Sequence, residues 1–196
     1  LKQDGTIDTS FNIVTGFDDY TTKVEYLNGK ILVGGNYTNF TSITDLTVDT
    51  TYINVDTTFI TVDATITSSY PMNNRIIKLN PDGSQDITFS SGTGFDFATL
   101  DIAINDDNSF YVSGYFTEYN GVPRNAIARL NQDGSLNPFE LLGTGFNGTE
   151  LGLLSSPIGD DGVIVWGDFT EYNGTPANRI IKLNSEGKIL MNDVVE

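Results

Sequence analysis

Leu79-Asn80-Pro81-Asp82-Gly83-Ser84 decides the fold, because this stretch returns twice along the chain. It returns as Leu130-Asn131-Gln132-Asp133-Gly134-Ser135, 51 residues on, and as Leu183-Asn184-Ser185-Glu186-Gly187-Lys188, a further 53 residues on. A related hexapeptide opens the sequence at residues 1–6. A fixed period near fifty residues is the signature of a propeller, a solenoid or another repeat array. A residue that recurs in every copy is therefore expected to serve the architecture before it serves any chemistry.

Three further landmarks keep the same period and the same order. They are a Thr-Gly-Phe motif (15–17, 93–95, 144–146), a Gly-x-aromatic-Thr motif (35–38, 114–117, 167–170) and an Asn-x-Ile-x-Lys/Arg-Leu motif (74–79, 125–130, 178–183). Four landmarks in register indicate a true structural repeat rather than a chance similarity of turns.

Short apolar runs rich in β-branched and aromatic residues lie between these landmarks. Lys30-Ile31-Leu32-Val33 follows Asn28-Gly29, a dipeptide that favours a tight hairpin because both turn positions need positive φ. Residues 109–112 and 163–166 are runs of the same kind, each preceded by Asn, Asp or Gly. Runs of this length and composition predict strands buried on both faces, and no window shows a convincing helical stripe.

A unit of about fifty residues with three or four short antiparallel strands cannot bury its faces alone, so such units stack on their neighbours. We therefore expect an all-β fold of β-propeller-type blades, which leave few sheet edges exposed. A β-solenoid is the alternative, although its coils are usually shorter. The expected organisation is one repeat domain over 1–196, with blades at about 1–40 plus 74–78, 79–129 and 130–182, a partial copy at 183–196 and an insertion at 41–73.

Taken together, the four landmarks resemble the delta-60 repeat family of bacterial and phage propeller-like domains. The resemblance covers nearly the whole chain apart from the insertion. Members of that family are mostly large surface, secreted or virion-associated proteins, often without an assigned activity. The resemblance thus implies a blade fold and a virion or cell-surface setting, and it supplies no catalytic residue.

The sequence departs from a complete propeller in its number of repeats. Three copies and a fragment are present, whereas a propeller typically has about four to eight blades, and the sequence begins at Leu1 without an initiator Met. We expect a processed chain, a segment of a longer protein, or a ring completed by other chains.

The first copy is also longer than the others, since Leu1 and Leu79 are 78 residues apart. The extra length lies between Phe40 and Asn73 and carries a seven-residue repeat rich in Thr, Val and Asp, a composition that favours extended chain over helix. An odd period reverses the face of each repeated residue on a regular strand, so bends are expected. Residues 41–73 are interpreted either as an arm that adds a strand to a neighbouring subunit, resembling Thr-rich segments of phage fibres, or as a loop expansion without a role.

The chain is strongly acidic, with 26 acidic and 10 basic residues and a formal net charge of −16. Binding to nucleic-acid phosphates needs a basic footprint, so this charge argues against nucleic acid as a partner and against an anionic membrane surface. No run of eighteen apolar residues is present, so no membrane insertion is expected. An acidic surface suits cations and basic partners.

Catalysis is restricted by the absence of His and Cys, which excludes Ser-His and Cys-His nucleophiles and the usual zinc sites. Two carboxylates about 5 to 10 Å apart could cleave a glycosidic bond, and some propellers act on sugars. The best carboxylates for such a role are Glu118, Glu150, Asp168 and Glu171. Glu118 and Glu171 share one repeat position, however, whereas catalytic carboxylates need distinct environments. We therefore expect that the chain is not an enzyme and that it has no catalytic and no cofactor-binding residue.

Calcium is the one metal that the loops could hold, because they cluster carboxylate and amide oxygens. The candidate ligands are Asp82, Asp86, Asp106, Asp107, Asp160 and Asp161. None has the spacing of an EF-hand, and Asp-Gly and Asn-Gly pairs are also what tight turns require.

The hexapeptide Phe-Thr-Glu-Tyr-Asn-Gly, at 116–121 and 169–174, supplies candidate ligand-binding residues. A Tyr beside Asn-Gly at a loop tip could stack on a sugar, or its ring could pack between blades; the candidates are Tyr119, Asn120, Tyr172 and Asn173. Phe116 and Phe169 are expected in the blade core. Trp166 stands where the other copies have Gly34 and Ser113, and it is expected to fill a gap between blades.

These patterns favour a non-catalytic structural or recognition module of an extracellular assembly. The first choice is a bacteriophage virion protein of the tail, fibre or baseplate, whose partners are other subunits. The alternative is a secreted or cell-surface bacterial adhesin that binds glycans through blade loops. A propeller glycosidase is the third reading.

Overall fold

The computed structural model describes residues 4–11, 16–41, 75–137, 144–156 and 162–190. Within these ranges the chain forms strands and turns and contains no helix. The expected all-β class is thus confirmed. Apart from Thr41, the insertion predicted at 41–73 lies outside the described residues, as do Asp160 and Asp161.

The described strands form three antiparallel sheets of three strands, which we call the N-terminal, middle and C-terminal blades. The N-terminal blade contains β2 (Thr21–Leu27), β3 (Lys30–Gly35) and β5 (Ile76–Leu79). The middle blade contains β6 (Thr99–Ile104), β7 (Phe110–Gly114) and β10 (Ile127–Leu130). The C-terminal blade contains β11 (Leu151–Ser155), β12 (Val163–Gly167) and β15 (Ile180–Leu183).

Each blade is accompanied by a short two-stranded sheet. These pairs are β1 (Gly16–Phe17) with β4 (Phe40–Thr41), β8 (Glu118–Tyr119) with β9 (Val122–Pro123), and β13 (Glu171–Tyr172) with β14 (Thr175–Pro176). The β8–β9 and β13–β14 hairpins turn through Asn120-Gly121 and Asn173-Gly174, in which all four residues have positive φ. That conformation is what a two-residue hairpin turn demands, and it explains the recurring Asn-Gly.

The Asn-Gly hairpin predicted in the N-terminal blade is confirmed. Asn28 and Gly29 have φ of 50° and 77° and join Leu27 of β2 to Lys30 of β3. The apolar runs expected as strands at residues 30–33, 109–112 and 163–166 correspond to β3, β7 and β12, the middle strands of the three blades, although β7 begins one residue later, at Phe110.

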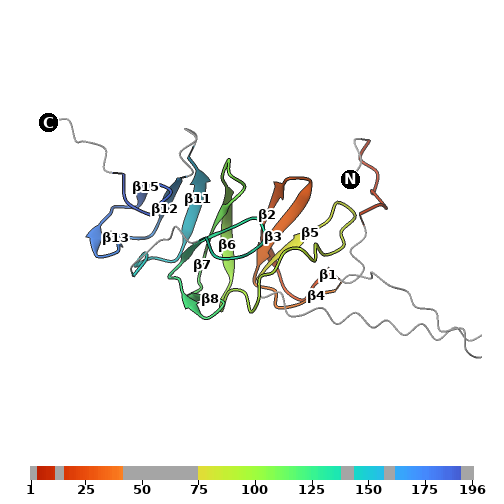
Figure 1. The fold of residues 1–196 in the computed structure, drawn as a ribbon, viewed down its shortest axis with the longest axis horizontal. Helices are drawn as coiled ribbons and strands as arrows, with labels where there is room; N and C mark the ends of the chain where they lie inside the picture. Colours follow the sequence, from red (N-terminus) through yellow and green to blue (C-terminus); the bar gives the residue numbers. More distant parts are fainter. Residues whose placement is uncertain (1–3, 12–15, 42–74, 138–143, 157–161, 191–196) are drawn as a thin grey trace, which may run out of the picture.

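The three blades lie side by side along the longest axis of the molecule, in chain order (Figure 1). Strand β6 of the middle blade contacts β2 on one side and β11 on the other. The described sheets do not close on one another, so the N-terminal and C-terminal blades form the two ends of an open array.

The hydrophobic core forms three clusters, two of which lie at the blade boundaries and one within the N-terminal repeat. One cluster joins Leu32 and Ile76 of the N-terminal blade to Ile102 and Val112 of the middle blade. A second joins middle-blade residues to those of the C-terminal blade, and includes Tyr111, Ile127, Leu153 and Val165. Blades therefore bury their faces against their neighbours, as the repeat length predicts. Phe116 and Phe169 are buried at 1% and 0% exposure, which confirms their expected core position.

Candidate ligand-binding site

The acidic residues of the repeated turns accept hydrogen bonds from residues of the same turn. Asp82 Oδ1 accepts hydrogen bonds from the amide and the hydroxyl of Ser84, at 2.9 and 2.7 Å. Asp133 makes the same pair with Ser135, at 2.9 and 2.6 Å. The serine hydroxyl, followed by its amide, lowers the pKa of each carboxyl below its ordinary value. The recurring Asp is therefore explained by turn geometry.

Other calcium candidates face cations. Asp86 Oδ2 lies 3.4 Å from Lys78 Nζ, and Asp107 Oδ2 lies 2.8 Å from an amino nitrogen of Arg129. No group of three or more potential metal-ligating side chains occurs within the described ranges. The calcium assignment of Asp82, Asp86, Asp106 and Asp107 stays a prediction.

Tyr119 and Tyr172 are buried, at 0% and 2% exposure, rather than presented at loop tips. Their hydroxyls donate to the carbonyls of Gly134 and Gly187, at 2.6 and 2.8 Å. Burial raises the pKa of both hydroxyls. Stacking on a sugar requires an exposed ring face, which neither residue offers, so packing is the reading that the geometry supports.

The neighbouring amides also bind backbone. Asn120 Oδ1 accepts from the amide of Gly94 at 3.0 Å, and Asn173 Oδ1 accepts from Gly145 at 2.7 Å. Each bond links the hairpin of a blade to the Thr-Gly-Phe motif of the same repeat. All four of the ligand-binding candidates thus hold the repeat together.

A recurring cation links each blade to the next. Lys78 Nζ donates to the carbonyl of Gln132 at 2.9 Å. Arg129, at the same repeat position in the middle blade, donates to the carbonyl of Ser185 at 3.0 Å. Gln132 and Ser185 occupy the same place in their turns, so the two boundaries use one connection.

Residues that break the repeat are better candidates for ligand contact, and two of them lie together on the middle blade. Phe97 is 54% exposed and Tyr115 is 37% exposed, and their rings meet edge to face with centroids 6.4 Å apart. At the position of Tyr115 the other copies have Asn36 and Asp168. The Tyr115 hydroxyl donates to Glu150 at 3.4 Å; burial and then this carboxylate raise the pKa of the hydroxyl.

Beside this aromatic pair lies a hollow of about 270 Å³ at the boundary between the N-terminal and middle blades. Arg75, Thr93, Asp96 and Glu118 line it. The Arg75 guanidinium lies 5.5 Å from the centroid of the Phe97 ring. Cation–π contact of this kind leaves the edge of the guanidinium available for hydrogen bonds.

Arg75 is held in an unusual state. Its φ is 70°, and one terminal nitrogen donates to the carbonyl of Phe95 at 2.9 Å. Its Nε is buried and has no hydrogen-bond partner within the described part of the chain. The hollow therefore combines a guanidinium with two carboxylates, and the exposed Phe97 ring lies outside its lining, in contact with Arg75. These are polar and aromatic groups that a small polar ligand would meet.

The charge of Asp96 is fixed by its surroundings. Partial burial alone would raise the pKa of Asp96, but hydrogen bonds from the Thr117 hydroxyl and from the Glu118 and Thr117 amides outweigh it and lower the pKa. Thr117 donates from its hydroxyl at 2.7 Å. Asp96 is therefore a carboxylate at neutral pH.

The repeat pattern alone did not single out Arg75, Phe97 or Tyr115. The signal that could have found Phe97 and Tyr115 is the mismatch between copies, since each is an aromatic residue at a position where the other repeats have none. Arg75 recurs as Arg179, so the same comparison does not single it out. Of the carboxylates considered for sugar cleavage, Glu118 lines the hollow and Glu171 begins β13. Glu150 and Asp168 lie together, since the amide of Glu150 donates to Asp168 Oδ1 at 3.3 Å.

Comparison with known protein families gives a match in three stretches of the chain. Residues 61–89, 106–139 and 159–189 match a model described as a domain of unknown function (DUF5122) beta-propeller. Each matched stretch contains one Leu-Asn-x-Asp/Glu-Gly turn and the outer strand before it, and the match bears out the expected propeller-type repeat. The comparison with curated proteins gives no match. No helix in the described ranges is long and apolar enough to span a bilayer.

Proposed function

We propose that this chain is a non-catalytic structural module of an extracellular assembly, most specifically a tail, fibre or baseplate protein of a bacteriophage virion. The observation that supports the proposal is which partners the recurring polar side chains bind. The turn aspartates, the buried tyrosines and the cations of the outer strands all bind the chain itself, at equivalent places in successive repeats.

Such use of side chains suits a scaffold. In a repeat array each unit is stabilised by its neighbours, and the blade rather than a single pocket is the functional element. The virion setting comes from the resemblance to the delta-60 repeat family and from the Thr-rich insertion. The partners are then other protein subunits, and the net charge of −16 opposes binding to nucleic acid.

The test is to fractionate the native source by size and to follow this chain by mass spectrometry. Recovery with large, nuclease-resistant particles is the expected result. Recovery only with cell envelopes or as free protein would overturn the virion role and favour an adhesin.

A second experiment examines the insertion. A variant that lacks residues 42–73 should retain the unfolding transition of the blades, since the described blades are formed by other residues, while losing incorporation into particles. Normal incorporation of the deletion variant would show that the insertion is a loop expansion rather than an arm.

Glycan recognition by a cell-surface adhesin is the second candidate, and the hollow beside Phe97 favours it. Exposed aromatic rings supply a stacking face, while Arg75, Asp96 and Glu118 supply hydrogen-bonding groups. A glycan array probed with the purified chain should identify a ligand. Phe97→Ala should then weaken binding by about tenfold or more. Ile87→Ala, which changes an 84% exposed side chain that does not line the hollow, is the control.

A further inference from the structure

The C-terminal blade exposes a face that both other blades bury. Ile180 is 63% exposed, whereas Ile76 and Ile127, at the same position of the outer strand, are 0% and 1% exposed. The equivalence follows from strand pairing, because these isoleucines pair with equivalent residues of the middle strands, namely Gly34, Ser113 and Trp166.

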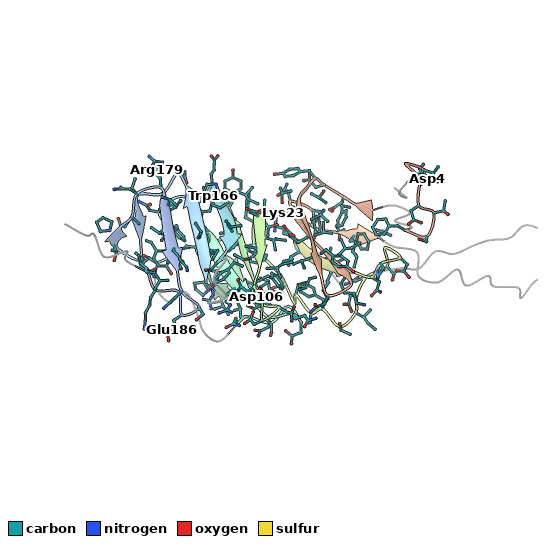
Figure 2. All side chains as sticks on the ribbon, turned by 90° about the horizontal axis from the view of Figure 1, so that it is seen from above. Asp4, Lys23, Asp106, Trp166, Arg179 and Glu186 are labelled. Atoms are coloured by element: carbon teal, nitrogen blue, oxygen red, sulfur yellow. The ribbon has the colours of Figure 1, made fainter. Side chains whose placement is uncertain are left out.

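The neighbouring positions repeat this contrast. Trp166 is 44% exposed, while its counterpart Ser113 is fully buried. Leu154 is 54% exposed, while its counterpart Ala103 is 6% exposed. We call Leu154, Trp166 and Ile180 the C-terminal open face; Figure 2 labels Trp166 at this end of the array.

In the other two blades the following blade covers this face. A Cβ atom on Gly34 would lie 2.7 Å from Thr99 Oγ1 and 3.2 Å from Ile102 of the middle blade. Ser113 Oγ donates to the carbonyl of Leu151 of the C-terminal blade at 2.7 Å. The two internal boundaries are thus built from equivalent strands, and a third boundary would use the C-terminal open face.

Trp166 is compatible with such a boundary despite its size. In the first two blades the inner strand carries the larger residue of this cross-strand pair, opposite Gly34 or Ser113. In the C-terminal blade the pair is reversed, since Gly152 lies opposite Trp166. A Cβ atom on Gly152 would overlap the indole, so the ring lies flat over the inner strand and takes the place of the missing side chain.

The opposite end of the array exposes the complementary half of the same boundary. Val24 and Tyr26 of β2 are 59% and 72% exposed. Ile102 and Leu153, which hold the position of Val24 in the next two blades, are 1% and 5% exposed because the preceding blade covers them. We call Val24 and Tyr26 the N-terminal open face.

Charge also matches between the two ends. Arg75 of the N-terminal blade lies over Phe97 of the middle blade. Arg179 is the equivalent of Arg75, with φ of 66° against 70°, and Asp19 is the equivalent of Phe97 when each is counted from its Thr-Gly-Phe motif. A boundary of the same geometry would therefore place a guanidinium beside a carboxylate.

We propose that copies of this chain associate head to tail, with the N-terminal open face of one copy on the C-terminal open face of the next. The inference rests on the proposed structural role and names the partner as a second copy. The contact is heterologous, so repetition gives a ring if the rotation closes and a filament if it does not. Two copies supply six blades, which lies within the usual range of about four to eight.

The test is sedimentation velocity of the full chain over a concentration series, with intrinsic fluorescence recorded in parallel. Trp166 is the only tryptophan, so its emission should shift to shorter wavelength as copies associate. Added salt should strengthen association, because the contact is largely apolar and each copy carries a net charge of −16. A chain that stays monomeric at all concentrations and salt levels would overturn the proposal.

Two variants and their mixture test the orientation. Ile180→Asp and Val24→Asp should each weaken association by about tenfold or more, while Ile87→Asp, at an 84% exposed site outside both faces, should leave it unchanged. In an equimolar mixture of the first two variants, Ile180→Asp keeps its N-terminal open face and Val24→Asp keeps its C-terminal open face. The mixture should therefore form dimers but no larger oligomers. Association that neither variant weakens, or a mixture that stays monomeric, would contradict head-to-tail contact.

The outcome separates this inference from the proposed function. A chain that remains monomeric when purified but is recovered in particles keeps its structural role and has another protein on the open faces. A chain that associates head to tail but never enters particles keeps the contact and loses the virion role.

Discussion

Asp101 on β6 and Lys23 on β2 form an ion pair across a blade boundary, with 3.0 Å between carboxylate oxygen and ammonium nitrogen. The hydrogen bond that Lys23 donates to Asp101 is the main cause that raises the pKa of Lys23. The other oxygen of Asp101 accepts from the amide of Leu153 on β11 at 2.8 Å. One side chain of the middle blade therefore holds both neighbouring blades.

Removing this carboxylate should destabilise the whole array. Asp101→Ala leaves the buried Leu153 amide without its acceptor, and we expect the free energy of unfolding to fall by about 1 to 3 kcal/mol in urea denaturation. Glu25→Gln is the control, because Glu25 also pairs with Lys23, at 3.1 Å, but lies within one blade at a more exposed site. Equal effects of the two changes would show that Asp101 has no role at the boundary.

The buried cation of the N-terminal blade provides a second prediction. Lys78 is 3% exposed, and Lys78→Met should lower the free energy of unfolding by about 3 kcal/mol, because the buried Asp86 loses its nearer cation and keeps Lys30, 3.7 Å away, and the hydrogen bonds from Thr88. Chemical denaturation of Lys78→Met, of Asp86→Asn and of Lys78→Met/Asp86→Asn measures the coupling.

The double variant should recover part of the loss, since it removes the unpaired charge as well. Lys188→Met, which breaks an exposed pair with Glu186, should have no measurable effect. If the double variant loses more free energy of unfolding than the two single variants lose together, the assigned pairing is contradicted.

The repeat allowed the fold to be predicted because turn chemistry is local. Asn28-Gly29 and the Asp-Gly turns specify their own backbone conformations, and the spacing of the copies then specifies stacked blades. The burial of Phe116 and Phe169 followed from the same pattern.

The candidate site was predicted less well, because exposure at a blade boundary depends on the neighbouring blade. Tyr119 stands beside Asn-Gly in the sequence, yet its ring turns inward to reach Gly134, fifteen residues away. Trp166 was expected to fill a gap between blades, but it lies 44% exposed over Gly152, on a face that the described residues leave open.

The ionised carboxylate of Asp96, at the hollow, should make the stability of the fold depend on pH. The pKa of Asp96 is lowered in the folded chain from 3.8, so its contribution to stability is present above about pH 4 and is lost as the pH falls through the folded pKa. Asp96→Asn should therefore be less stable than the wild type at pH 5 to 7, and the difference should close at lower pH.

Urea denaturation at several pH values, with Asp106→Asn as an exposed control, measures this difference. A gap between wild type and Asp96→Asn that stays constant down to pH 3 would show that the ionised carboxylate is not what stabilises the fold. Figure 2 labels the control residue Asp106, in the turn between β6 and β7.

Tyr119 separates a structural role from a ligand-binding one. If its ring stacked on a glycan at a loop tip, truncation would leave stability unchanged. In the structure the ring is fully buried, with its centroid 4.6 Å from that of Phe95. Tyr119→Ala should therefore lower the free energy of unfolding by about 3 to 5 kcal/mol through cavity formation.

Tyr119→Phe isolates the hydroxyl, whose bond to the Gly134 carbonyl should contribute about 1 kcal/mol. Tyr172→Phe should give a similar loss, because its hydroxyl binds Gly187 in the equivalent turn. Tyr115→Phe, at an exposed ring, is the matched control and should unfold at the urea concentration of the wild type. Wild-type stability in Tyr119→Ala would place the ring outside the core and restore the loop-tip interpretation.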